Sequence, residues 1–290
     1  MFPPRAPALL GRKQSSTRDE GVSRGTPAVA RARRRFGQNF LTDPAAIQRI
    51  VAALALQRGD IVLEIGPGRG SLTDALLEAV PSIVAIEIDR DLAALLRARY
   101  PEARLRLIEN DVLGIAFDAV APSAPLVIAG NLPYNISKPV AMKLVVERRA
   151  VHRAVLMFQR EVADRLTASP GDRAYGPLTV LAGLAYRIEH LFDLGPGAFQ
   201  PRPNVDSTVT RWTRRDDDVL PEDLVAPLMA ALRAAFAHRR QTVQKNLRGV
   251  LAGGDAAAVH VLAQAGIDGA LRAEAIAPAG FVAIARAWPS

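Results

Sequence analysis

Residues 63–73 read LEIGPGRGSLT, a glycine-rich turn between an apolar segment and an amphipathic one. The apolar run before the turn predicts a buried strand, and the periodic pattern after it predicts a helix. Gly66, Gly68 and Gly70 let the backbone turn tightly and approach a ligand that a Cβ atom would keep away. A strand, a glycine turn and a helix in this order are typical of the ligand-binding turn of a nucleotide-binding α/β domain.

The rest of the chain extends this unit. Strands are predicted at 60–66, 82–88, 104–109, 125–130, 153–159 and 207–212, with helices at 43–54, 71–80 and between most of the later strands. Alternating strands and helices favour a parallel sheet covered on both faces. After the polar segment RRDDD, four further helices are predicted at 222–236, 240–251, 255–265 and 278–287. We therefore predict a Rossmann-like α/β domain over residues 31–215 and a small all-helical domain over 216–290.

Composition excludes several classes of protein. The 290 residues are 49% hydrophobic and 23% charged, which is enough apolar material for a sizeable core. The absence of cysteine removes disulfides, cysteine-ligated zinc and iron–sulfur clusters. The four histidines are far apart in the sequence, so we expect no metal. No apolar run approaches the length of a membrane span, so we expect no membrane partner.

Positive charge is concentrated at the N-terminus. Residues 1–35 hold nine basic and two acidic residues, whereas the remaining 255 residues hold 28 basic and 27 acidic ones. Residues 1–30 contain Pro, Ser and Gly without hydrophobic periodicity, which predicts a basic, disordered tail. This tail is interpreted either as a solubilising leader or as an arm that neutralises phosphates. We favour the leader for residues 1–30 and RNA binding for Arg33, Arg34 and Arg35.

Two acidic residues follow strands next to the glycine turn. Glu87 lies at the end of the second predicted strand, where a carboxylate accepts hydrogen bonds from ribose hydroxyls. Asp111 follows the third strand, where a carboxylate can accept from an adenine amine. Each acid alone is also explained as a solvated loop residue. Together with the glycine turn they predict adenosine binding, which NAD and S-adenosylmethionine (SAM) share.

The segment AGNLPYNIS, residues 129–137, favours SAM over NAD. The exocyclic amine of a nucleobase is a poor nucleophile because its lone pair is delocalised into the ring. The Asn131 side-chain oxygen and the Leu132 carbonyl, whose conformation Pro133 restricts, can accept its N–H groups and favour a more nucleophilic nitrogen. Tyr134 supplies a face on which an extruded base can stack. Hydride transfer to or from NAD needs no such group, although an ordinary Asn-Pro turn has the same residues.

Seven segments together resemble the KsgA/RsmA-type small-subunit rRNA adenine N6,N6-dimethyltransferases, from about residue 33 to 288. They are RRFGQNFLTD (34–43), EIGPGRGSLT (64–73), IEIDRDLAALL (86–96), GNLPYNIS (130–137), FQPRPNVDSTV (199–209), AFAHRRQTVQKNL (235–247) and GIDGALRAEAI (266–276). The glycine turn alone is found in SAM-dependent methyltransferases at large, whereas the set in this order is specific to this family. Gln241 departs from the pattern, since a lysine is expected after the arginine pair.

The resemblance implies SAM-dependent dimethylation of two adjacent adenines in a hairpin near the 3′ end of 16S rRNA. It implies that residues 31–215 form the methyltransferase domain, that residues 216–290 bind RNA, and that the immature small ribosomal subunit is the partner. SAM contacts are implied at Asn39, Leu41, Gly66, Gly68, Glu87, Asp111 and Asn131. Phe199 matches a family aromatic that sandwiches the target base opposite Tyr134, or it is a core phenylalanine. We expect a monomer in the bacterial cytoplasm.

Other functions stay open at this point. The Erm resistance methyltransferases act on large-subunit rRNA and share QNFL and a similar catalytic tetrapeptide. The complete NLPYNIS segment and FAHRRQTVQKNL favour the small-subunit family. A ribosome-assembly factor with a vestigial SAM pocket is the main alternative from another class, and a nicotinamide oxidoreductase is a distant third.

The region 224–254 contains no acidic residue, which favours phosphate contact over an ordinary solvated face. Its predicted RNA-binding residues are Arg233, Arg239, Arg240, Lys245 and Arg248. If one helix ran through the region, Arg239 would point toward the apolar stripe. The helix therefore breaks there, or Arg239 joins the two domains.

Overall fold

The computed structural model describes residues 38–122, 124–217 and 219–289. The predicted tail over residues 1–30 and the predicted RNA contacts Arg33, Arg34 and Arg35 lie outside the described residues. Of the predicted methyltransferase domain, residues 31–37 also lie outside the described residues.

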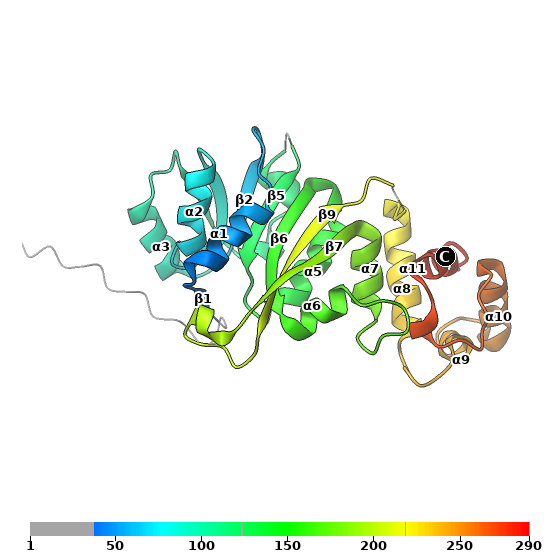
Figure 1. Ribbon diagram of the computed structural model, residues 1–290. Helices are drawn as coiled ribbons and strands as arrows, with labels where there is room; N and C mark the ends of the chain where they lie inside the picture. Colours follow the sequence, from blue (N-terminus) through cyan, green and yellow to red (C-terminus); the bar gives the residue numbers. More distant parts are fainter. Residues whose placement is uncertain (1–37, 123, 218, 290) are drawn as a thin grey trace, which may run out of the picture.

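A seven-stranded sheet forms the centre of the molecule, with strand order β4-β3-β2-β5-β6-β9-β7 (Figure 1). The parallel strands are β2 (Ile61–Ile65), β3 (Ile83–Glu87), β4 (Leu105–Glu109), β5 (Leu126–Asn131) and β6 (Val151–Gln159). Strand β9 (Ser207–Arg214) pairs antiparallel with both β6 and the edge strand β7 (Tyr186–Leu194). The predicted α/β class is confirmed and every predicted strand is present, whereas β7 was not predicted.

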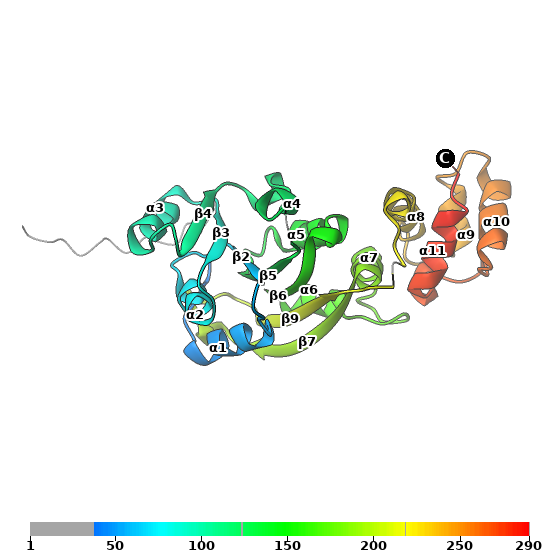
Figure 2. The ribbon, with the colours of Figure 1, turned by 90° about the horizontal axis from the view of Figure 1, so that it is seen from above.

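Helices cover both faces of the sheet, as Figure 2 shows from above. The first set is α1 (Pro44–Ala53), α2 (Ser71–Ala79) and α3 (Arg90–Arg99), and the second is α4 (Phe117–Val120), α5 (Ser137–Val146), α6 (Arg160–Leu166) and α7 (Pro177–Ala185). Neighbouring residues of one strand point to opposite faces. Accordingly Val62 packs into the core that includes Leu76 of α2, while Leu63 packs into the core that includes Leu144 of α5.

The C-terminal part is helical. It contains α8 (Val225–Ala235), α9 (Val243–Arg248), α10 (Gly254–Ala265) and α11 (Pro278–Arg286). Their buried residues, among them Leu232, Leu247 and Phe281, belong to the same hydrophobic cluster as the α5–α7 face of the sheet. The helical part is thus packed directly on α7 (Figure 1). None of the described helices is long and apolar enough to cross a membrane.

The region between residues 224 and 250 contains two helices, as the predicted ranges 222–236 and 240–251 indicated, and not one continuous helix. Helix α8 ends at Ala235 and α9 begins at Val243. The buried side chain of Asn246 donates from Nδ2 to the carbonyls of Ala235 (2.6 Å) and His238 (3.1 Å), which satisfies orphan acceptors at the end of α8. These two bonds hold α9 against the end of α8 and so stabilise the bend between the two helices.

Candidate active site

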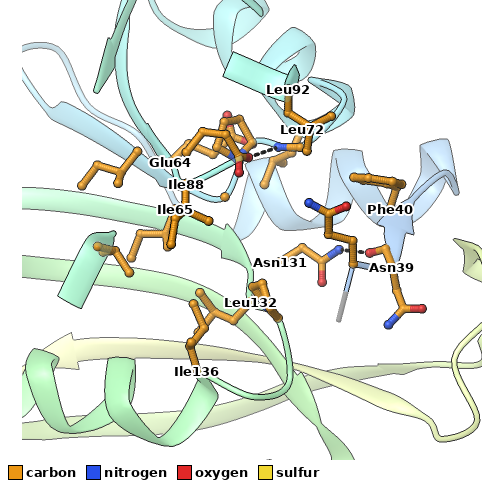
Figure 3. Close-up of a pocket in the computed structure, with 18 of the residues that line it drawn as sticks. Asn39, Phe40, Glu64, Ile65, Leu72, Ile88, Leu92, Asn131, Leu132 and Ile136 are labelled. Carbon is orange, nitrogen blue, oxygen red and sulfur yellow. Dashed lines mark hydrogen bonds between the residues drawn. The ribbon is translucent and has the colours of Figure 1, made fainter. Parts of the chain in front are cut away.

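A cavity of about 330 Å³ lies at the carboxyl ends of β2, β3 and β5 (Figure 3). The strand order reverses between β2 and β5, because the chain runs outward from β2 through β3 to β4 and then returns to β5 on the other side. Ligands of open α/β sheets bind in the crevice at this switch point. The topology alone therefore assigns the cavity as the candidate site.

The glycine turn forms one wall of the cavity. Gly66, Gly68 and Gly70 have φ angles of 69°, 58° and 85°, a conformation that residues with a Cβ atom rarely adopt. A Cβ atom on Gly68 would lie 2.9 Å from the ring of Phe40, so the short strand β1 (Phe40–Leu41) packs directly on the turn. The hydroxyl of Tyr100 donates to the carboxylate of Asp74 (2.6 Å) and lies 3.3 Å from the Gly70 carbonyl, which supports the turn from below.

Glu87 ends β3 and is 4% exposed. Its carboxylate accepts hydrogen bonds from the backbone N–H groups of Gly68 (3.1 Å) and Asp89 (2.9 Å). Burial raises the pKa of Glu87, and the two backbone donors act against that rise. The carboxylate is therefore held against the glycine turn, and its remaining lone pairs suit the paired hydroxyls of a ribose.

Asp111 is exposed at the end of β4, and its carboxylate accepts from the Leu113 N–H at 3.0 Å. Both acids line the cavity together with Gly66 and Gly68. This donor and acceptor set fits the adenosine part of SAM. It also fits that of NAD, so the opposite wall of the cavity decides the chemistry.

Asn131, at the end of β5, occupies that opposite wall. Its Nδ2 donates to the backbone carbonyl of Asn39 at 2.7 Å (Figure 3). Because a carbonyl oxygen only accepts, this bond assigns the amide nitrogen to the Asn39 side, and Oδ1 remains as an acceptor. The following turn is closed by the Pro133 carbonyl, which accepts from Ile136 N (3.1 Å) and from the Ser137 hydroxyl (3.3 Å).

The structure brings together ten of the predicted site residues. Those that line the cavity are Asn39, Leu41, Gly66, Gly68, Glu87, Asp111, Asn131, Leu132, Pro133 and Tyr134. Phe199 does not line it. It lies in β8 (Phe199–Gln200), is 3% exposed and packs in the core on the α1–α3 face. Phe199 therefore occupies the position of a core phenylalanine, which was one of its two interpretations. A role for Phe199 in stacking on the target base stays a prediction.

Glu64 was missed in the sequence reasoning. It is 1% exposed, lines the cavity from β2 and accepts a 2.6 Å hydrogen bond from the hydroxyl of Thr73. Burial raises the pKa of Glu64 to about 8. An acid inside the otherwise apolar run IVLEI was the available signal, because a charged residue in a buried strand usually has a function.

Comparisons with known proteins identify the family of the chain. A family model described as ribosomal RNA adenine dimethylase matches residues 29–287. The chain belongs to the ribosomal RNA adenine dimethylase family. A protein of Acidithiobacillus ferrooxidans named ribosomal RNA small subunit methyltransferase A is 41% identical over 260 residues, which is 89% of this chain and 95% of that protein. The protein of that name from Laribacter hongkongensis is 44% identical over 250 residues, 86% of this chain and 93% of its own length.

Two solved structures of similar proteins support this family assignment. A dimethyladenosine transferase from Plasmodium falciparum has a TM-score of 0.73 at 26% identity and covers 84% of this chain and 95% of its own. The 23S rRNA methyltransferase ErmE has a TM-score of 0.65 at 25% identity, with 86% and 99% covered. The fold is therefore shared with a methyltransferase of 23S rRNA, whereas curated relatives at 40–45% identity carry the small-subunit name.

The basic residues of the C-terminal part differ in their contacts. Arg233, Arg240, Lys245 and Arg248 are exposed on α8, α9 and the segment between them. Arg239 donates instead to the carbonyls of Arg173 (3.0 Å) and Tyr175 (3.1 Å) and lies 3.5 Å from Glu274. In this member of the dimethylase family, both expectations for Arg239 therefore hold: the helix breaks, and Arg239 joins the helical part to the loop before α7.

Proposed function

We propose that this protein uses SAM to dimethylate N6 of two adjacent adenines in a hairpin near the 3′ end of 16S rRNA, on the immature small subunit in the cytoplasm. The observation that carries the proposal is the hydrogen bond from Asn131 to Asn39, which leaves an amide oxygen as acceptor at the end of β5. Membership of the dimethylase family and the names of the curated relatives support the choice of substrate.

The cofactor would be held by the wall that the glycine turn, Glu87 and Asp111 form. Glu87 accepts from the ribose hydroxyls, Asp111 from the adenine amine, and the backbone of Gly66 and Gly68 approaches closely because neither has a Cβ. Asn39, which precedes β1, and Leu41, which ends it, close the same cavity. SAM supplies a methyl group that is activated by attachment to a sulfonium.

The opposite wall would hold the target base. The Asn131 Oδ1 and the Leu132 carbonyl accept the two N–H groups of the amine, which orients its lone pair toward the cofactor side of the cavity. Neither acceptor is a strong base, so the site acts by positioning the reacting nitrogen. Tyr134 contributes the stacking face, worth about 1–3 kcal/mol per base.

RNA binding is assigned to the exposed cations of the C-terminal helices, and to Arg33, Arg34 and Arg35, which precede the described residues. Arg233, Arg240, Lys245 and Arg248 are exposed, and we assign them to one phosphate-binding track. Arg239, the fifth predicted contact, is bonded instead to the loop before α7. We assign no metal to the reaction, because methyl transfer from a sulfonium needs none, and we expect the protein to act as a monomer.

Mass spectrometry of rRNA fragments tests the function. Immature small subunits that lack the modification are incubated with the protein and SAM, and the 3′-terminal hairpin is then isolated. We expect two adenines, each with two added methyl groups, and no change in large-subunit rRNA treated in parallel. Methylation of the large-subunit rRNA would instead support an Erm-type activity. Binding to the small subunit without any methyl transfer would support an assembly factor.

A further inference from the structure

The hydroxyl of Tyr134 is bonded to a serine to which the sequence motifs assigned no individual role. Tyr134 Oη lies 3.2 Å from Oγ of Ser207, the first residue of β9. Ser207 is completely buried and is paired with Gln159 of β6 on one side and Leu194 of β7 on the other. Residues inside a sheet with a strand on each side are among the least mobile in a fold. The serine is therefore a rigid support.

The tyrosine, in contrast, stands on a connecting turn. Tyr134 follows the end of β5, is only partly buried and lines the cavity. Its ring is attached to the turn at Cβ and to the sheet at the hydroxyl. The hydroxyl lies on the Cβ–Cγ axis, so this bond restricts rotation about the Cα–Cβ bond and fixes where the ring lies. A stacking face contributes most when its position is fixed before the base arrives, because the ordering cost is then already met.

The backbone of the turn is held independently of this bond. Another buried serine, Ser137, donates to the Pro133 carbonyl at 3.3 Å, and Ile136 N donates to the same carbonyl at 3.1 Å. Loss of the Ser207 hydroxyl would thus release the ring of Tyr134 while the turn keeps its shape. Ser207 thus holds the ring of Tyr134, whereas Ser137 holds the backbone of the turn.

We propose that Ser207 is a positioning residue for the base-binding face: its hydroxyl fixes the ring of Tyr134 across the mouth of the cavity. The inference rests on the proposed function in one respect, that the base of an RNA substrate stacks on Tyr134. It assigns Ser207 no contact with SAM or with the reacting nitrogen. Ser207 should therefore affect turnover of RNA and leave SAM affinity unchanged.

A double-mutant cycle tests the proposal. Wild type, Ser207→Ala, Tyr134→Phe and the double variant are compared for kcat/KM with the small-subunit substrate. Each single variant should lose about three- to tenfold, the effect of one buried neutral hydrogen bond. The double variant should lose no more than either single one, because both remove the same bond. Calorimetric Kd for SAM should stay within about twofold of wild type in all four.

Thr208→Val is the matched control. Thr208 is the next residue of β9, is equally buried, and its hydroxyl donates to Asp193 at 2.6 Å on the other side of the strand. This variant removes a buried hydrogen bond from the same strand without touching Tyr134. It should keep the wild-type kcat/KM for RNA. Losses that multiply in the double variant, or a wild-type rate in Ser207→Ala, would overturn the assignment.

NMR of the four tyrosine rings separates this inference from the proposed function. Tyr134→Phe identifies the Tyr134 ring signals by their loss. We expect these signals to report a more mobile ring, with a lower order parameter, in Ser207→Ala but not in Thr208→Val, because the hydroxyl anchor is removed while Ser137 and Ile136 still hold the turn. Unchanged Tyr134 signals in Ser207→Ala refute the positioning role whatever the activity. If wild type transfers no methyl group to RNA although the ring signals change as expected, the proposed function fails and the restraint stands.

Discussion

The side-chain amide of Asn131 donates to the backbone carbonyl of Asn39, 92 residues earlier in the chain, at 2.7 Å. The segment around Asn39 also contacts the cofactor wall of the cavity. Gln38 donates to Asp89 at 3.2 Å next to Glu87, and the ring of Phe40 packs on Gly68. Residues 38–41 therefore join the cofactor wall to the base-binding wall.

This arrangement predicts that Asn131→Ala lowers kcat strongly and SAM affinity less. The variant removes the acceptor for the amine, so kcat should fall about a hundredfold or more, as for other groups that orient a reacting atom. It also releases Asn39, so SAM affinity should fall, but by less than about tenfold. A tritiated-SAM assay gives the first quantity and calorimetry the second.

The control for this variant is Asn204→Ala, which removes an exposed amide from the loop before β9. It should leave both quantities near wild type. Substantial methyl transfer by Asn131→Ala would show that the amide does not orient the amine.

Glu87→Gln should weaken SAM binding at least about tenfold. A buried carboxylate that accepts from hydroxyl groups contributes roughly 1.5–3 kcal/mol, and the neutral amide replaces one acceptor by a donor. Glu109 is the matched residue, because it is paired with Glu87 across β3 and β4 but is exposed and bonded to Arg97 at 2.7 Å. Calorimetry should find SAM affinity unchanged in Glu109→Gln. Equal SAM affinities in Glu87→Gln and Glu109→Gln would show that Glu87 does not bind the ribose.

The sequence predicted the parallel strands and the site residues because both follow from local signals. Apolar runs and turn residues mark β2, β3 and β5, and parallel strands present their carboxyl ends at one edge. Asn131 and Glu87 meet at the cavity for that reason. Strand β7 was missed because it is an edge strand whose side chains are only partly buried, so its pattern carries less apolar signal.

Contacts made by tertiary structure were not predictable from local pattern. Ser207 and Tyr134 are 73 residues apart, and their bond depends on β9 running antiparallel beside β6. Phe199 is buried because the two-residue strand β8 pairs with β1, and two residues are too few to show a periodicity. Arg239 was expected to join the two domains, but its partners, two carbonyls of a loop more than 60 residues away, were not predicted. Such pairings need the fold before they can be inferred.

The raised pKa of Glu64 predicts how stability depends on pH. An unfolded glutamate titrates near 4.5, whereas the folded carboxyl keeps its proton up to about 8. Between these values the folded state binds more protons, so the contribution of Glu64 to stability is lost as pH rises through this window. Glu64→Gln mimics the protonated carboxyl and should remove the loss.

Thermal unfolding between pH 5 and 9 measures this effect. The Tm of Glu64→Gln should gain on wild type as pH rises, by about 3 °C or more at the alkaline end. Glu102→Gln, which changes an exposed glutamate, should follow the wild-type curve. Parallel curves for Glu64→Gln and wild type would mean that Glu64 is ionised in the folded protein at neutral pH.

The contacts of Arg239 and Arg240 predict that these adjacent residues act differently. Arg239→Gln loses hydrogen bonds to the Arg173 and Tyr175 carbonyls, so the free energy of unfolding should fall by about 1 kcal/mol. Arg240 is exposed, and Arg240→Gln should leave the Tm unchanged while lowering the slope of log K against log salt for RNA binding by about one. Removal of Lys245 and Arg248 in addition should lower the slope further. An unaltered slope in this triple variant would place the phosphate track on another face of the protein.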